Sequence, residues 1–239
     1  FKDKIEAIEV GIRVGFAYIT LGSVASPLEG FVKLGIKKRK DGGEYFCLYY
    51  SGPVRSAGGT AASVSVLIAD YIRKKFGYSK YDPTEKEAKR AYTELVDYHE
   101  RVTNLQYFPS EQEVAFLVSN LPVQIDGDPS EKFDVSNYKD LDRIETNKLR
   151  NGFCLVIAEC LAQKAPKVLA QLQKWGKDFG MEDWDFLNEF VSIQKKLKSK
   201  EKIGDKKEKI KPDDTFMKDI VAGSPGLPSP FSKGGLRRR

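Results

Sequence analysis

The chain has 239 residues, of which 41% are hydrophobic and 31% are charged, and its formal net charge is +6. This length can bury a sizeable core in one or two domains, and the composition is typical of a soluble globular protein. No stretch reaches the roughly 20 apolar residues of a membrane helix, so the sequence predicts no membrane contact and a cytoplasmic location, while the positive charge permits nucleic-acid or acidic partners.

Residues 4–20 carry apolar side chains at near-helical spacing, which predicts the first helix. Gly11 and Gly15 lie four positions apart on it, on one face. A face cleared in this way lets a neighbouring element approach closely, so we expect a packing contact there.

A β-hairpin is predicted next. Residues 31–38 and 44–50 flank a Lys-Asp-Gly-Gly sequence at 40–43, a strong turn signal because glycine and aspartate tolerate positive φ. The run from Tyr45 to Tyr50 is aromatic and apolar without a break, which is typical of a strand buried on both faces. We therefore expect a small antiparallel hairpin near 31–50.

A glycine-rich loop follows the second strand and leads into a helix that ends at Gly77. Gly58 and Gly59 supply the freedom in φ that a tight turn needs, and Thr60 is expected to be the N-cap of the helix. The apolar face of this helix is formed by Val64, Leu67, Ile68, Tyr71 and Ile72.

This loop is a candidate anion site, because the first-turn N–H groups of a helix are unpaired and its dipole is positive there. Arg55 can add a bidentate phosphate contact. The candidate DNA- or anion-binding residues are Arg55, Ser56, Gly58, Gly59 and Thr60. A purely structural interpretation is also open: the small residues let the loop pass closely under another backbone, and Arg55 pairs with a carboxylate. The loop lacks the Gly-Lys-Ser/Thr of a Walker A motif.

Two capping boxes mark the starts of the next two helices. Thr84 precedes Glu87 by three positions, and Ser110 precedes Glu113 in the same way. Apolar residues at helical spacing follow each box, and Pro122 ends the second helix.

Residues 122–143 are predicted to form a long polar loop. Within it, Asp126-x-Asp128 resembles the carboxylate spacing of many two-metal enzymes, so a self-contained nuclease is one hypothesis. The local sequence Asp-Gly-Asp-Pro is also that of an ordinary turn, and it has no EF-hand pattern. We favour the turn, and we predict no metal site and no catalytic residue in the chain.

Residues 149–172 carry the longest apolar helical pattern, interrupted by Pro166, which either kinks one helix or begins a second. Asp183 is expected to cap the last helix. Trp175 and Trp184 are expected to close the helical bundle by core packing, with stacking on nucleotides as the alternative.

The composition changes after residue 194. Residues 195–211 contain nine lysines and three acids, which indicates a linker or solvated tail, with phosphate attraction as the alternative. The expected organisation is a mostly helical domain over 1–194, a Lys-rich linker over 195–212, and a short segment with a flexible tail over 213–239. The fold class is α+β: a predominantly helical domain with one small antiparallel hairpin and a disordered basic C-terminal tail.

Side chains that usually carry metal or redox chemistry are few. Cys47, Cys154 and Cys160 lie in apolar contexts without zinc spacing, so buried free thiols in a reducing compartment are expected. His99 has no Cys or second His near it, which argues against a metal site. Numerous Lys and Glu with only two Met are typical of a thermophile.

The chain resembles the N-terminal region of the large subunit of archaeal family D DNA polymerase, almost continuously from about residue 5 to residue 223. The stretches that carry this resemblance are residues 13–30, 49–60, 121–129, 145–152 and 213–223. The sequence departs from the family after Gly223.

The resemblance implies a replicative heterodimer. In that family the large subunit holds the nucleotidyl-transfer site, for which Mg²⁺ is expected, and the small subunit holds a metal-dependent 3′ to 5′ exonuclease. The polymerase aspartates and the zinc-type cysteine clusters of the family lie downstream of this region. The resemblance therefore implies no catalytic residue here, no cofactor in this fragment, and no activity of the fragment alone.

Two roles compete within this resemblance. The first is a non-catalytic scaffold that docks the exonuclease subunit or a second copy of itself, which the many aromatic residues and well-patterned helices favour. The second is a DNA-positioning module that contacts phosphates through Arg55, the Gly58–Gly59 turn and the lysine tract. The expected partners are thus the small exonuclease subunit, DNA and a second copy of the chain.

Overall fold

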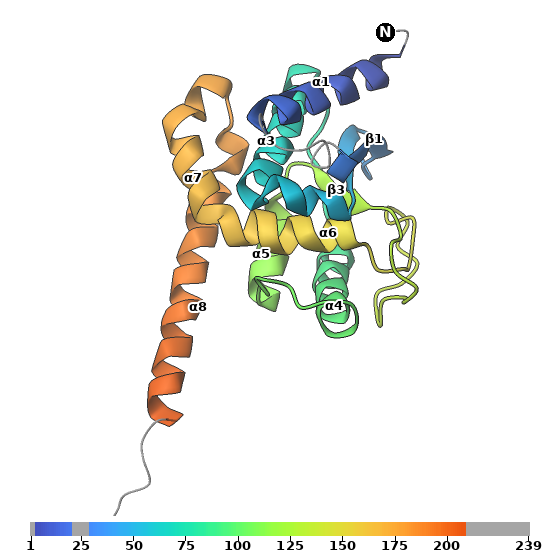
Figure 1. Cartoon of the computed structure of the whole chain (residues 1–239). Helices are drawn as coiled ribbons and strands as arrows, with labels where there is room; N and C mark the ends of the chain where they lie inside the picture. Colours follow the sequence, from blue (N-terminus) through green and yellow to red (C-terminus); the bar gives the residue numbers. More distant parts are fainter. Residues whose placement is uncertain (1–2, 21–28, 209–239) are drawn as a thin grey trace, which may run out of the picture. The chain divides into compact units, whose positions relative to one another are not determined.

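The computed structural model describes residues 3–20 and 29–208 (Figure 1). The chain divides into two units, Phe1–Lys195 and Lys196–Arg239. The described residues confirm the α+β, predominantly helical class, whereas the predicted tail, 213–239, lies outside them. The elements are α1 (Lys4–Ile19), β1 (Phe31–Lys38), β2 (Glu44–Tyr50), η1 (Gly52–Ala57), α3 (Gly59–Lys75), α4 (Glu85–Arg101), α5 (Glu111–Asn120), β3 (Gln124–Gly127), α6 (Asn151–Leu155), η2 (Val156–Ala162), α7 (Gln163–Trp175), η3 (Lys177–Phe179), η4 (Glu182–Trp184) and α8 (Phe186–Glu208).

Strand β2 is the centre of a three-stranded sheet with the order β1-β2-β3. β1 pairs with it in antiparallel fashion, which confirms the hairpin, and Gly42 in the turn has a φ of 85°. β3 pairs with the other edge of β2 in parallel, with Leu48 opposite Ile125. Because both edges are paired and α3 and α6 contact the strand, β2 is buried from Tyr45 to Tyr50.

Strand β3 shows that the prediction of a continuous loop over 122–143 is wrong for Gln124–Gly127. All four residues are buried and pair with β2. A strand this short, with Ile125 as its one large apolar residue, leaves no alternation that a sequence pattern can detect. Its conformation depends on a partner strand far away in the sequence.

The close contact predicted at the α1 glycines is confirmed. A Cβ on Gly15 would lie 3.0 Å from Cγ2 of Ile68 in α3, and a Cβ on Gly11 would lie 3.8 Å from Cδ1 of Ile72. The missing side chain of Gly15 therefore lets α1 lie directly against α3, whereas the contact at Gly11 has room for a methyl group.

Two other local predictions are also confirmed. The Thr84–Glu87 and Ser110–Glu113 capping boxes begin α4 and α5, with both reciprocal hydrogen bonds present in each. Cys47, Cys154 and Cys160 are buried free thiols. In each case the signal lies within a few residues of the feature that it predicts.

Pro166 lies inside α7 and does not begin a new helix. α6, η2 and α7 follow one another without a break, η2 is a π-helix, and Figure 1 shows the axis turning between α6 and α7. Proline has no N–H to donate to the carbonyl four residues earlier, that of Ala162. Nε2 of Gln194, on α8, donates to this carbonyl instead, at 3.0 Å. The kink of one continuous helix is thus the correct alternative.

Asp183 does not cap the last helix, contrary to expectation. It lies in η4, and α8 begins three residues later, at Phe186. Its carboxylate forms an ion pair with Nζ of Lys80 at 2.7 Å and accepts a hydrogen bond from Nη2 of Arg73 at 3.2 Å. These long-range partners, which the sequence does not reveal, hold Asp183 against α3.

The two tryptophans differ in their surroundings. Trp184 is 1% exposed, and its Nε1 donates to Asp70 of α3 at 2.9 Å, so it closes the core as expected. Trp175, the last residue of α7, is only half-buried and meets the ring of Phe179 edge-on.

Helix α8 runs to Glu208 and so includes part of the Lys-rich segment 195–212. The division between the two units falls after Lys195. The assignment of this segment as a linker stays a prediction.

Candidate functional site: a glycine-rich loop beside an apolar groove

The glycine-rich loop begins with η1, which follows β2 directly. Gly58 then has a φ of 78° and is the N-cap of α3. As a glycine it has no side chain with which to cap the helix. The prediction of Thr60 as the N-cap is therefore wrong, because α3 begins at Gly59 and Thr60 is its second residue. The positive φ of Gly58 ends the 3-10 turn and allows this early start.

Arg55 pairs with a carboxylate. Its Nη2 donates to Oε1 of Glu159 at 3.2 Å, and the same oxygen accepts from the backbone N–H of Gln106 at 2.8 Å. Glu159 is 5% exposed and belongs to the π-helix η2. A Cβ on Gly59 would lie 2.6 Å from the Glu159 carbonyl oxygen, so only glycine lets the loop approach η2 this closely. These contacts match the structural interpretation; anion binding by the five predicted residues stays a prediction.

An open groove of about 960 Å³ lies beside this loop. Its walls come from the end of α1, from α3 between Gly59 and Tyr71, and from the end of α7 with the turn that follows. Gly58, Gly59 and Thr60 of the predicted site line it, whereas Arg55 and Ser56 do not. The other lining residues are Tyr18, Ile19, Ala57, Ala61, Val64, Leu67, Ile68, Tyr71, Gln171, Trp175, Phe179 and Met181.

The groove exposes large apolar side chains, and no charged side chain is among the described residues that line it. Tyr18 is 74% exposed, Phe179 51% and Ile19 38%. Exposed apolar surface gathered in one concave place is typical of an interaction site on a soluble protein. The groove, which we call the α1–α3–α7 groove, is therefore the strongest candidate for function in the described residues.

The sequence pattern does not locate this groove, although one signal for it exists. The sequence shows one apolar face on α3, yet only Leu67 is fully buried there; Val64, Ile68 and Tyr71 are half-buried and line the groove. The face is wider than one packed neighbour requires. A stripe of this width indicates a second neighbour but not its identity.

Asp126 lies in a buried ion network and not in the turn that its sequence favoured. The side chain is 2% exposed; Oδ1 accepts from Arg150 Nη1 at 2.5 Å and Oδ2 from Lys37 Nζ at 3.0 Å. Nη2 of Arg150 also donates to Oε2 of Glu94 at 2.5 Å. Asp128, the other member of the predicted pair, is exposed. Across residues 3–20 and 29–208, no group of three or more His, Cys, Asp or Glu side chains is placed to hold a metal.

The same network holds the segment that follows β3. Arg90 is fully buried, donates to Oε2 of Glu94 at 3.2 Å, and donates to the carbonyl oxygens of Tyr138 at 3.2 Å and Thr146 at 3.1 Å. Tyr138 has a φ of 54°, which is uncommon for a residue other than glycine. Buried charges thus replace secondary structure as the support of this segment.

Acid is expected to weaken the network through Asp126. Burial by itself raises the pKa of Asp126, but the charges of Arg150 and Lys37 outweigh it, so the pKa in the folded state is lower than usual. The unfolded-state pKa is about 3.9. The stabilisation is therefore complete above that pKa and is lost as the pH falls through the folded-state pKa.

Urea unfolding at neutral and at acidic pH measures this effect. Asp126→Asn is expected to lose less stability between pH 7 and pH 3 than the unaltered chain, because it has no carboxylate to protonate at this position. Asp128→Asn, the exposed neighbour, is expected to behave as the unaltered chain does. Equal acid sensitivity of all three chains would contradict the assignment.

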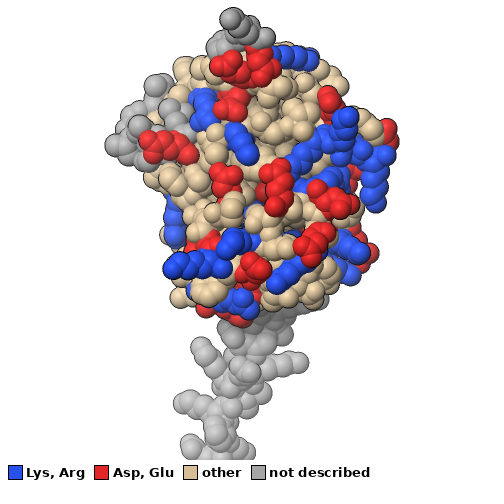
Figure 2. Space-filling model, turned by 90° about the vertical axis from the view of Figure 1, so that its right-hand side faces the viewer, with Lys and Arg blue, Asp and Glu red and all other residues tan. Residues whose placement is uncertain are grey.

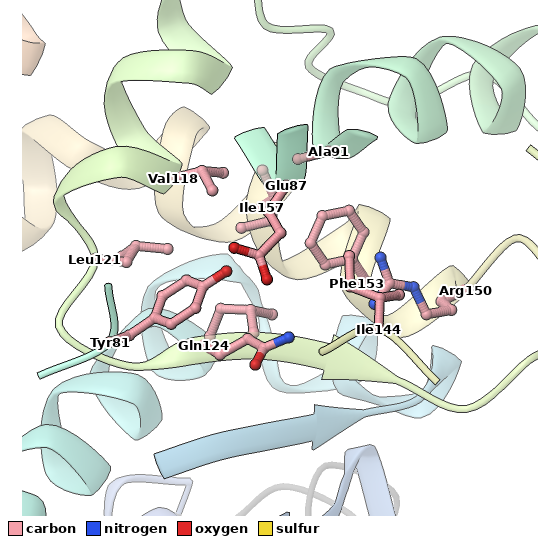
Figure 3. Close-up of a pocket in the computed structure, with 11 residues that line it drawn as sticks. Tyr81, Glu87, Ala91, Val118, Leu121, Gln124, Ile144, Arg150, Phe153 and Ile157 are labelled. Carbon is pink, nitrogen blue, oxygen red and sulfur yellow. The ribbon is translucent and has the colours of Figure 1, made fainter. Parts of the chain in front are cut away.

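A small internal cavity lies between β3, α4, α5 and α6 (Figure 3). Its volume is about 20 Å³, and its walls are mainly apolar, with the polar ends of Tyr81, Glu87 and Gln124 beside them. A cavity of this size has room for about one water molecule. It cannot hold a nucleotide or another substrate.

The surface charge of the first unit is mixed. Figure 2 shows Lys and Arg interleaved with Asp and Glu over one face, and an open cleft of about 760 Å³ places Lys38 and Lys86 beside Glu85 and Asp142. Residues 195–239 contain 14 of the 40 basic and 6 of the 34 acidic side chains, so residues 1–194 contain 26 and 28. The positive excess of the chain therefore lies entirely beyond residue 194.

Comparisons with known proteins agree on one family. The family model described as "DNA polymerase II large subunit DP2, N-terminal" matches residues 1–193. The chain is 46% identical over 264 residues to the DNA polymerase II large subunit of Nanoarchaeum equitans, with 100% of the chain and 21% of that protein covered. It is 46% identical over 239 residues to that of Methanosarcina barkeri (100% and 20%) and 44% identical over 236 residues to that of Archaeoglobus fulgidus (99% and 20%).

The chain thus spans about a fifth of the length of the curated relatives that it matches. Within the residues that the structure describes, the helices are too short or too polar to cross a membrane.

Proposed function

The chain belongs to the family of N-terminal regions of the DNA polymerase II large subunit, and we propose that it is a non-catalytic docking module of that polymerase. The family membership confirms the resemblance drawn from the sequence. In this proposal the whole large subunit, in a cytoplasmic heterodimer, performs DNA-directed DNA synthesis. Its nucleotidyl-transfer site and Mg²⁺ lie outside residues 1–239, and the small subunit supplies a 3′ to 5′ exonuclease.

One observation carries the docking role: the α1–α3–α7 groove is wide and apolar, and the described residues that line it carry no charge. The buried centres of protein interfaces are depleted in charged residues and enriched in aromatic ones. Tyr18, Tyr71, Trp175 and Phe179 provide four aromatic rings along the groove. A surface with these properties supports contact with protein, and the partners expected from the sequence are the small subunit and a second copy.

Charge placed in the groove is expected to weaken the polymerase assembly. Tyr18→Asp and Phe179→Asp change exposed side chains, so the fold itself tolerates them, but each puts a carboxylate into an apolar contact. We expect each to weaken co-purification of the large and small subunits at moderate salt, by roughly thirtyfold in affinity if the position is an interface hot spot worth about 2 kcal/mol.

Phe133→Asp is the matched control for this experiment. Phe133 is 49% exposed, close to the 51% of Phe179, but it lies outside the groove. It is expected to leave assembly unchanged. If all three variants assemble equally well, the groove is not a docking surface and the proposal is wrong.

The DNA-positioning role remains a second candidate because residues 195–239 carry 14 basic against 6 acidic side chains. Its predicted anion loop is less favoured, since Glu159 neutralises Arg55 and the first unit has no positive excess. We therefore expect Arg55→Ala to leave the salt dependence of DNA binding by the large subunit unchanged. A log–log salt slope that falls by about 0.9 would instead establish a phosphate contact at Arg55.

A further inference from the structure

The α1–α3–α7 groove presents more apolar surface than the described residues cover. Val64, Ile68 and Tyr71 of α3 face it half-buried, and Tyr18 at the end of α1 is 74% exposed. Trp175 and Phe179, which also line it, pack edge-on, and the ring of Phe179 meets that of Tyr71 edge-on as well. Three helices thus border an open, apolar space.

The absence of charge along this lining indicates the kind of contact that the groove makes. Interfaces that exchange partners resemble ordinary protein surface, whereas permanent ones are more hydrophobic and resemble the inside of a domain. Elsewhere the first unit is densely charged, with 54 Lys, Arg, Asp and Glu side chains in residues 1–194, yet the described residues that line the groove include none of them. The groove is therefore suited to a permanent occupant, and it offers nothing to a phosphate backbone.

The relatives show where such an occupant is available. The chain spans 20–21% of their length, so about four-fifths of each relative's polypeptide lies outside the part that corresponds to this chain. A segment joined to the module by the same polypeptide has an effective concentration on the order of millimolar. Such a tethered segment can therefore cover the groove as soon as the subunit has folded. A partner that must be met in solution leaves an apolar surface open in the meantime, which is an aggregation hazard.

Resting on the docking function proposed above, we propose that the α1–α3–α7 groove holds an amphipathic helix from the part of the large subunit that lies outside this chain. A groove bordered by helices accepts the apolar face of such a helix. The buried face of the occupant is uncharged, to match the lining. The contact is intramolecular: it fixes this module onto its own subunit in the arrangement that binds the small subunit, so a charge in the groove weakens assembly by releasing the module.

Hydroxyl-radical footprinting of the full-length large subunit tests this directly. Phe179 and Phe133 are the same residue type and are equally exposed in this chain, at 51% and 49%, but only Phe179 lines the groove. In the large subunit alone, at any concentration, we expect Phe179 to lose its labelling while Phe133 stays labelled. Tyr18→Asp, which puts a charge into the groove, is expected to restore labelling of Phe179 toward that of Phe133.

Each other result overturns the inference in a different way. Protection of Phe179 that appears only when the small subunit is added would retain the docking function and assign the groove to that subunit. Protection that disappears on dilution would assign it to a second copy. Equal labelling of Phe179 and Phe133 in the large subunit alone and in the complete polymerase would remove both this inference and the docking function.

Discussion

Arg150→Met is expected to lower the free energy of unfolding by about 3–5 kcal/mol, the usual cost of removing one partner from a buried ion pair. Arg150 is 1% exposed and donates to two carboxylates, that of Asp126 at 2.5 Å and that of Glu94 at 2.5 Å. Its guanidinium also lies 4.3 Å from the centre of the Phe153 ring. Methionine replaces the apolar part of the side chain but leaves both carboxylates without their shared donor.

Urea unfolding followed by circular dichroism measures this loss. Lys148→Met, at an exposed position two residues earlier, is the matched control and is expected to change the stability by less than about 0.5 kcal/mol. Glu94→Gln is a second test of the same network. It removes the buried negative charge that pairs with the positive charges of Arg90 and Arg150. A loss below about 1 kcal/mol for Arg150→Met would mean that the network does not stabilise the fold.

Gly152→Ala is expected to destabilise the chain by about 3 kcal/mol, at the upper end of the cost of overpacking. Gly152 is the second residue of α6 and is buried where this helix crosses the end of β2. A Cβ there would overlap the backbone of Tyr50 and would lie 2.5 Å from the backbone nitrogen of Ser51. Backbone cannot move aside as the end of a flexible side chain can, so the whole contact between α6 and β2 must shift.

Gly11→Ala is the control, and the sign of its effect is expected to be opposite. Gly11 lies exposed inside α1, and an added Cβ would meet only Cδ1 of Ile72, at an ordinary 3.8 Å. Alanine in a helix interior is more stable than glycine by about 0.5–1 kcal/mol. Thermal or urea unfolding of the two variants compares them directly. Similar effects in both would show that backbone crowding at Gly152 is not the reason for glycine there.

The features that sequence analysis predicted correctly have local signals. Thr84 with Glu87 and Ser110 with Glu113 lie three positions apart, and the hairpin turn lies within the five residues between its strands. The physical cause in each case is a hydrogen bond or a backbone conformation that involves only neighbours. Such signals are present in full in the sequence.

The features that it missed depend on partners far away in the chain. Arg150 and Glu94 are 56 positions apart, so nothing near Asp126 indicates that its carboxylate is buried between Arg150 and Lys37. The sequence Asp-Gly-Asp-Pro therefore looked like a turn, and the short strand that contains Asp126 was missed with it. Tertiary pairing decided the local structure here.

The candidate site was predicted only in part for a related reason. The sequence located the glycine-rich loop and allowed Arg55 to pair with a carboxylate, but it could not show that the carboxylate is Glu159, 104 positions later. Nor could it show that Gly58, Gly59 and Thr60 border the α1–α3–α7 groove. A groove exists where no other part of the chain covers an apolar face. The periodicity of a sequence shows that a face is apolar, but it does not show whether the face is covered.

The parallel pairing of β3 with β2 has a consequence for how the protein is made. Cys47 and its partner Gln124 are 77 positions apart, so at about 5–20 residues per second the ribosome needs roughly 4–15 s to deliver the second strand after the first. During that interval the hairpin can form, but one edge of β2 stays open to other chains. We therefore expect nascent chains that are stalled before residue 127 to aggregate more readily than chains stalled at later stages of synthesis.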